Sequence, residues 1–170
     1  MEKSSSKTWR MKKVFNLFKS SSNDLLSSKL YNDKSFYDQF IRDLRHCKKE
    51  VIIESPFLTL RRAEQLAPTF VKLVKKGVKI VVTTRYPKDH TNNLHVQADA
   101  TIPYLARLGI EVRLLPDLPH RKIAILDKKI LWEGSLNILS HNSSSEIMRR
   151  IESGRLSRQM LGFIKHNAVF

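Results

Sequence analysis

The order of apolar patterns along residues 23–170 restricts the possible folds more than any other feature of the chain. Short apolar runs, each the length of one buried strand, alternate with longer stretches whose apolar residues recur at helical spacing. Strands are expected at residues 27–32, 51–55, 78–83 and 111–115. Helices are expected after Ser35, which could cap the first one, then at residues 63–74 and 98–108. This order predicts a sheet covered by helices, with right-handed crossovers.

The last part of the chain predicts further strands and a closing helix. Residues 120–126 and 129–132 are expected to form a hairpin that turns at Asp127 and Lys128. Another strand is expected near residues 146–151, and an amphipathic helix over residues 156–164. The polar residues 85–95 are expected to form a loop. We therefore predict a single α/β domain, in which a mixed β-sheet is flanked by helices on both faces.

Residues 1–22 differ from the domain that we expect at residues 23–170. They are rich in Ser and Lys, and apolar residues recur at helical spacing between two Ser triplets. This pattern predicts a short basic amphipathic helix with Met11, Val14, Phe15 and Phe18 on its apolar stripe. The stripe could pack on the domain itself, on a partner, on a phosphate backbone or on a membrane surface.

The charge of the chain indicates a polyanionic partner. Lys and Arg number 31 against 16 Asp and Glu, which gives a formal net charge of +15. Nucleic acid is the first expectation and an anionic membrane the second, while a basic protein without such a ligand remains the alternative. The sequence contains no apolar run long enough to span a bilayer and no secretory signal. Cys47 is the single cysteine, which fits a reducing cytoplasm.

One segment carries the residues for phosphodiester chemistry. From His120 to Asn137 it reads H-x-K-x4-D-x6-G-S-x-N. His120 and Lys122 are two apart on an expected strand, so their side chains share a face. The ammonium group would neutralise phosphate oxygens, and the imidazole would act as nucleophile or as acid and base near neutral pH. An Asn amide can hold a phosphoryl oxygen whose charge grows in the transition state.

This segment resembles the signature of the phospholipase D superfamily, including its small bacterial nucleases. The resemblance extends to residues 52–57 and covers about residues 25–170. It implies that His120 attacks phosphorus to form a phosphohistidine, and that a second, symmetry-related His protonates the leaving oxygen. It also implies that Lys122 and Asn137 bind the phosphoryl group beside Ser135. Glu146 matches the acid that orients the nucleophile in relatives, although Ser144 replaces the Asn that often precedes this acid.

Asp127 completes the expected catalytic set, and in relatives it serves structure more than chemistry. Further substrate contacts are expected from Arg121 within the motif segment, from Arg61 and Arg62 after the strand at 51–55, and from His95 in the polar loop 85–95. His90, His141, Asp89 and Cys47 lack the spacing of a zinc site, so no metal is expected. No Gly-rich phosphate loop is present in the sequence, and no cofactor is expected.

The resemblance implies two motifs per active site, and this chain has one. A symmetric homodimer is therefore expected. The first functional hypothesis is a metal-independent phosphodiesterase that cleaves DNA or RNA. The second is a nucleic-acid-binding module that is catalytically silent, or active only beside a helicase or restriction-system partner. The third is a phospholipid-processing enzyme that the basic N-terminal segment recruits. Cleavage of an oligonucleotide without added metal separates the first from the second, and vesicle binding tests the third.

Overall fold

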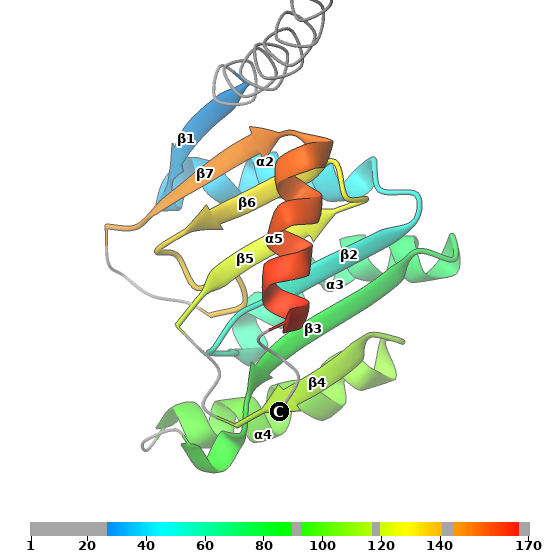
Figure 1. Ribbon diagram of the computed structural model, residues 1–170. Coiled ribbons are helices and arrows are strands. Elements are labelled where there is room, and N and C mark those ends of the chain that lie inside the picture. The colour runs from blue at the N-terminus through cyan, green and yellow to red at the C-terminus, as the bar shows by residue number, and fades with distance from the viewer. Residues whose placement is uncertain (1–26, 90–92, 117–119, 141–144, 167–170) are drawn as a thin grey trace, which may run out of the picture.

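The structure, a computed structural model, describes residues 27–89, 93–116, 120–140 and 145–166. These residues form one sheet of seven strands in the order β1-β7-β6-β5-β2-β3-β4 (Figure 1). The strands are β1 (Ser28–Asn32), β2 (Glu50–Glu54), β3 (Lys79–Arg85), β4 (Glu111–Leu115), β5 (Lys122–Leu126), β6 (Ile130–Gly134) and β7 (Ile147–Glu152). The helices are α2 (Asp33–Arg45), α3 (Leu60–Lys75), α4 (Asn93–Arg107) and α5 (Gly154–His166), with a short 3-10 helix η1 (Pro87–Asp89). The expected segment 1–22 lies outside the described residues.

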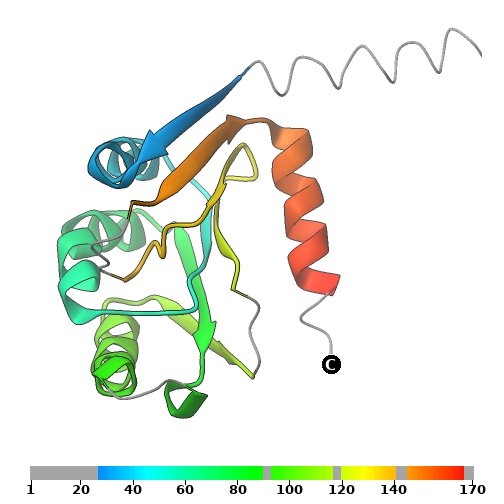
Figure 2. The same cartoon turned by 90° about the vertical axis from the view of Figure 1, so that its left-hand side faces the viewer.

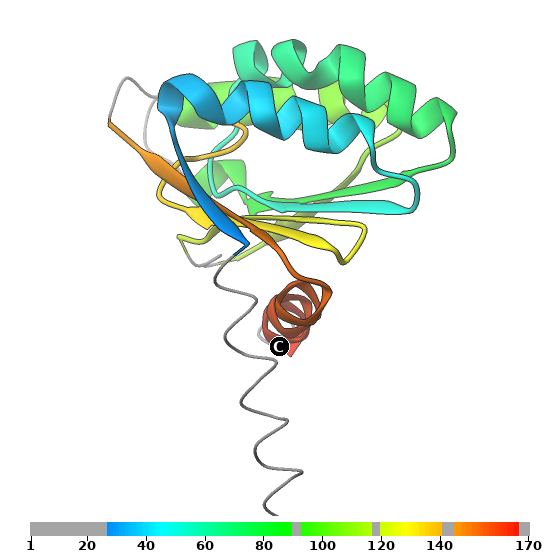
Figure 3. The same ribbon diagram turned by 90° about the horizontal axis from the view of Figure 1, so that it is seen from above.

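The sheet is mixed and has helices on both faces, as the sequence predicts. Strands β2, β3 and β4 are parallel, whereas β5 pairs antiparallel with β2 and continues into the antiparallel strands β6, β7 and β1. Helices α2, α3 and α4 cover one face, and α5 covers the other (Figures 2 and 3). The β-α-β order of the first half and the hairpin of the second are therefore both confirmed.

Side chains along the hairpin alternate between two cores, one on each face of the sheet. Ala124, Leu126 and Trp132 belong to the core under α2, α3 and α4. Ile123 and Leu131 belong to a smaller core under α5. Because side chains alternate along a strand, Lys122 shares the face of Ala124. The turn at Asp127 and Lys128 has positive φ at both residues, which is the geometry of a tight two-residue hairpin.

Two predictions about helix starts were wrong. Helix α2 is capped by Asn32, not by Ser35, which instead completes a capping box from the third helical position. The expected loop 85–95 contains the end of β3, η1 and the first residues of α4. In that first turn His95 pairs with Asp99 at 2.9 Å, one helical turn apart on an exposed face. Such a polar first turn produces no apolar periodicity, so the pattern did not show it.

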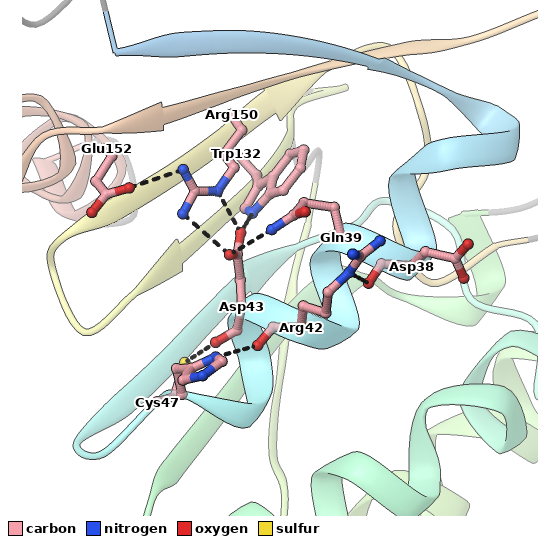
Figure 4. Close-up of polar contacts among 9 residues, drawn as sticks. Asp38, Gln39, Arg42, Asp43, Cys47, Trp132, Arg150 and Glu152 are labelled. Carbon is pink, nitrogen blue, oxygen red and sulfur yellow. Dashed lines mark hydrogen bonds and ion pairs between the residues drawn. The ribbon is translucent and has the colours of Figure 1, made fainter.

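A buried polar group fastens α2 to the sheet (Figure 4). The Asp43 carboxylate accepts hydrogen bonds from Trp132 Nε1 at 3.0 Å and from the Arg150 guanidinium at 2.7 and 3.1 Å. Gln39 donates a further bond at 3.1 Å. Trp132 is fully buried, so its ring N–H needs this partner. Helix α2 is thus bonded to both β6 and β7.

Candidate functional site

His120, Lys122 and the loop of Asn137 lie at one end of the sheet. Parallel strands β2 and β3 finish at this end, and antiparallel β5 begins there (Figure 1). His120 comes just before β5, whose first residue is Lys122. Lys122 pairs in register with Gly134, the last residue of β6, so the loop that carries Asn137 starts opposite the lysine. The ends of β2 and β3, the start of β5 and the loop after β6 therefore lie together at this end of the sheet.

The pKa values of His120 and Lys122 are both lowered in the structure. Lys122 Nζ donates a hydrogen bond to the His120 carbonyl oxygen at 2.7 Å. The pKa of His120 is lowered by the positive charge of Arg85, then by desolvation and by Lys122. Burial likewise lowers the pKa of Lys122, although the charge of Glu146 opposes this shift. The imidazole is exposed and is held toward its neutral form, which is the form that can act as a nucleophile.

Glu146 comes to the site from a different part of the chain. It immediately precedes β7, and its charge acts on the Lys122 ammonium group. A carboxylate beside the ammonium favours the protonated lysine, which is the form that binds phosphate oxygens. The structure thus brings Glu146 close to Lys122.

Asn137 is buried in a loop that several hydrogen bonds hold in place. The Leu139 N–H donates to Ser55 Oγ at 3.1 Å, and the Leu139 carbonyl accepts from the Thr59 N–H at 2.8 Å. The Tyr37 hydroxyl donates to the Ile138 carbonyl at 3.1 Å. These bonds connect the loop to β2, to the start of α3 and to α2. Within the described part of the chain, Asn137 Oδ1 is buried without a hydrogen-bond partner. This oxygen can accept a bond but cannot donate one, so any bond to a phosphoryl oxygen has to come from the amide N–H groups.

Ser135 and Gly134 join β6 closely to β7. The Ser135 N–H donates to the Ile147 carbonyl at 3.0 Å, and the Ile147 N–H donates to Ser135 Oγ at 3.1 Å. A Cβ atom at position 134 would lie 2.8 Å from the Met148 sulfur and against the Ile147 carbonyl oxygen. Only glycine therefore permits this approach of the two strands. The Ser135 hydroxyl is bonded to the backbone of Ile147, which indicates a structural role for this motif residue.

Two members of the expected set lie away from this place. Asp127 is at the opposite end of β5, where its carboxylate accepts bonds from the N–H groups of Lys48, Lys49 and Glu50 at 2.8 to 2.9 Å. Arg121 points to the face covered by α5 and pairs with the buried Glu54 at 2.8 Å. Neighbouring strand residues face opposite sides, so Arg121 cannot share the face of Lys122. Neither residue is retained in the site proposed below.

The remaining expected substrate contacts lie on the first turns of two helices. Arg61 is exposed at the start of α3. The Arg62 guanidinium lies over the Tyr37 ring, 3.5 Å from its centroid. His95 is held by Asp99 on α4. These three residues remain candidates for contacts with a substrate that extends beyond the motif.

Sequence reasoning missed the roles of Arg85 and Phe57. The Phe57 ring lies 5.9 Å from the His120 ring, and the Arg85 guanidinium carbon lies 6.0 Å from the Phe57 centroid. Arg85 also has the largest effect on the pKa of His120. Because residues that end parallel strands meet at the same end of a sheet, the position of Arg85 at the end of β3 was an available signal. The prediction of a loop there concealed it.

No metal centre accompanies these residues in the described part of the chain. Within residues 27–89, 93–116, 120–140 and 145–166, no group of three or more His, Cys, Asp or Glu side chains could hold a metal ion. Burial raises the pKa of the Cys47 thiol to about 12, so this cysteine is not a nucleophile at neutral pH.

No helix in the described part of the chain combines the length and the apolar character that a bilayer-spanning segment needs.

One family model matches most of the chain, and solved structures share its fold. A family model described as cardiolipin synthase, PLD-like domain, matches residues 40–166. Nuc from Salmonella typhimurium, a phospholipase D family member, superposes with a TM-score of 0.68 at 20% identity over 82% of this chain and 92% of that one. NucT from Helicobacter pylori gives a TM-score of 0.66 at 20% identity over 82% and 93%.

A longer protein shares the same fold. Phosphatidylserine synthase from Haemophilus influenzae gives a TM-score of 0.61 at 13% identity, over 84% of this chain and 38% of that one. No curated protein sequence matches the chain. At these identities the solved structures establish the fold, and the family model extends the likeness over most of the domain.

Proposed function

Because the chain belongs to the phospholipase D superfamily, we propose that it is a metal-independent phosphodiesterase that cleaves DNA or RNA. The observation that carries this proposal is the position of His120. It is an exposed imidazole, its pKa is lowered by neighbouring positive charge, and the Lys122 ammonium is beside it. Such a pair suits direct attack of a protein nitrogen on phosphorus.

The proposed reaction has two displacements. In the first, a His120 ring nitrogen forms a bond to phosphorus while the bond to the leaving oxygen breaks, and a second His gives that oxygen its proton. In the second, water attacks the phosphohistidine and gives its proton to the second His, which lost one in the first step, while the phosphorus–nitrogen bond breaks and releases the phosphate product and His120. Lys122 neutralises the phosphoryl oxygens, and Asn137 donates to the oxygen whose charge grows. The charge of Glu146 raises the pKa of Lys122 and so partly offsets the lowering by burial, which favours the protonated lysine.

A second copy of the chain is proposed to supply the second His. One surface supports this homodimer: a groove of about 400 Å³ that is lined by Lys122 and Gly134 together with Leu30, Ile147 and Phe163. Those three apolar side chains are exposed to between 56% and 59%. Large exposed apolar side chains next to a candidate site favour an association surface. A two-fold axis near this groove would bring two copies of the motif together.

Nucleic acid is the favoured substrate because of charge. A formal net charge of +15 favours a long polyanion, whose counterions are released on binding. A second candidate is phosphatidyl transfer on lipids. It is favoured by the description of the matching family model and by the likeness to phosphatidylserine synthase.

Incubation with oligonucleotides in excess chelator tests the proposal. The wild type is expected to cleave, and His120→Ala is expected to lose at least about 10²-fold in rate, as for removal of a reacting acid-base group. His46→Ala is the matched control, because His46 is exposed at the end of α2 and its ring bonds to the backbone carbonyl of Arg42, away from the motif. Loss of cleavage in chelator with recovery in Mg²⁺ would contradict the metal-independent mechanism. Turnover of anionic phospholipid vesicles, with no cleavage of nucleic acid, would favour the lipid candidate.

A further inference from the structure

Phe57 lies next to the candidate nucleophile. Its ring is only partly buried, and it is tilted by 52° to the His120 ring at a centroid distance of 5.9 Å. The Arg85 guanidinium carbon lies 6.0 Å from the centroid of the same Phe57 ring. Arg85 is also close enough to lower the pKa values of both His120 and Lys122. An accessible aromatic ring and a cation therefore lie beside the place where a phosphate would react.

The backbone around Phe57 is held by fully buried side chains. Ser55 Oγ donates to the Phe57 carbonyl at 2.9 Å, and Thr84 Oγ1 donates to the Pro56 carbonyl at 3.3 Å. Ser55 and Thr84 are each 0% exposed. The same Ser55 Oγ accepts the N–H of Leu139, which anchors the loop of Asn137. The ring and the phosphate-binding amide are thus positioned by one shared hydroxyl.

We propose that Phe57 stacks on the base next to the scissile phosphate, that Arg85 contacts the adjoining backbone phosphate, and that the substrate is therefore single-stranded. Aromatic rings beside cations bind single strands in this manner, because every base has a face that can stack. In a duplex the base remains between its neighbours, and moving it onto Phe57 costs unstacking and unpairing energy. This inference rests on the nuclease function proposed above.

A structural role for Phe57 makes a different prediction. If the ring only shields His120 from water, its removal lowers kcat on every phosphodiester, whether or not a base is present. If the ring stacks on a base, its removal raises KM only where a base is available. The split between KM and kcat, and the comparison of substrates with and without bases, separate the two roles.

The test uses one short sequence in three forms: a single strand, the corresponding duplex, and a strand of abasic nucleotides. Phe57→Leu is expected to raise KM for the single strand about 5- to 150-fold, which corresponds to the loss of about 1–3 kcal/mol of stacking. Phe57→Trp, which retains a larger ring, is expected to keep KM at or below the wild-type value. For the abasic strand, the wild type and Phe57→Leu are expected to have the same KM. The wild type is expected to prefer the single strand over the duplex.

Several outcomes would overturn the inference. One is that the wild type cleaves the single strand and the duplex equally well. Another is that Phe57→Leu leaves KM for the single strand unchanged. A third is that Phe57→Leu raises KM for the abasic strand as much as for the single strand. If Phe57→Leu unfolds, a Phe57→Trp variant that binds the single strand much more weakly than the wild type also overturns it. Affinity is measured separately by fluorescence anisotropy in chelator. If no strand is cleaved but Phe57→Leu still binds the base-bearing strand more weakly, the stacking site stands and the nuclease function fails.

Discussion

His120 lies beside positive charge that comes from two other parts of the chain. Arg85 ends β3, and Lys122 begins β5. Together with desolvation, these charges lower the pKa of His120, and Arg85 has the largest effect. A neutral imidazole is the form that attacks phosphorus, so a lowered pKa keeps the nucleophile available at more acidic pH.

Replacing Arg85 is expected to move the acidic limb of the pH–rate profile. Arg85→Gln removes the main charge that disfavours the imidazolium, so the pKa of His120 rises and the acidic limb of kcat/KM shifts to higher pH. The measurement is kcat/KM on a single-stranded oligonucleotide across the range from acid to neutral. Arg107→Gln, which alters an exposed arginine on α4, serves as the control and should leave the limb in place. A limb at unchanged pH in Arg85→Gln would show that this charge does not control the nucleophile.

Asp127 is expected to matter for stability instead of chemistry. Burial opposes its ionisation, but bonds from three backbone N–H groups outweigh burial and lower its pKa. Its stabilising effect is thus present at neutral pH and is lost as the pH falls through this lowered pKa. In Asp127→Asn the side-chain oxygen can still accept from the N–H groups of Lys49 and Glu50. The Lys48 N–H then faces the amide NH₂ group, which is also a donor.

The expected cost of Asp127→Asn is about 1–3 kcal/mol, as for one unsatisfied donor. Chemical denaturation at neutral pH measures this loss, which should shrink at acidic pH where the wild-type carboxylate also becomes protonated. The rate constant per folded molecule should stay near the wild-type value, because Asp127 lies at the far end of β5 from Lys122. A large loss of kcat with unchanged stability would instead place Asp127 in the reaction.

At the scale of the elements, α2 depends on one buried carboxylate. Asp43 bonds to Trp132 on β6 and to Arg150 on β7, and both of the charged side chains are largely buried, at 7% and 14% exposed (Figure 4). Helix α2 also supplies Tyr37, whose hydroxyl holds the loop of Asn137. The attachment of this helix therefore affects the site from a distance.

Removing the Asp43 carboxylate is expected to destabilise the fold strongly. Asp43→Ala leaves the Arg150 guanidinium and the Trp132 N–H without their main acceptor, and breaking a buried pair in this way costs about 3–5 kcal/mol. The double variant Asp43→Leu/Arg150→Met removes both charges and should lose less than Asp43→Ala alone. The measurement is the free energy of unfolding in urea for Asp43→Ala, Asp43→Leu, Arg150→Met and the double variant. A loss in the double variant equal to the sum of the Asp43→Leu and Arg150→Met losses would indicate that the pair is not coupled.

At the scale of the whole molecule, the chain presents one motif and a groove with exposed apolar side chains beside it. The proposed active site needs two histidines, and only a second copy can supply the same residue again. A symmetric pair places the same surface of each copy against the other. The proposed dimer is therefore a condition for activity, which subunit mixing can test.

Subunits of wild type and His120→Ala are mixed, unfolded and refolded so that they pair at random. If each site needs His120 from both copies, activity per total protein follows the square of the wild-type fraction, and an equal mixture gives about a quarter. If each chain works alone, the same mixture gives about one half by the same counting. A mixed dimer retains one nucleophile but lacks the acid, and that loss costs about 10²–10⁴-fold, too much to raise a quarter to a half. A linear dependence, with mixing verified by mass, would falsify the two-histidine dimer.

The sequence by itself determined the strands, most of the helices and the type of chemistry. Apolar runs and helical spacing are local properties, so the β-α-β order and the hairpin at Asp127 could be predicted without coordinates. The motif from His120 to Asn137 pointed to phosphodiester chemistry because its residue types and spacing are themselves local. Helix α4 began earlier than expected, because its first turn is polar and its exposed ion pair has no apolar period.

Only the tertiary structure decided which residues surround the imidazole. Phe57 and Arg85 are far from His120 in sequence, and strand order and register bring them to one end of the sheet. It also decided that Arg121 faces Glu54 and that Asp127 holds the turn before β2, although both belong to the motif segment. The reason is physical: a linear pattern specifies the face of a strand, whereas the partners across that face depend on how distant strands pair.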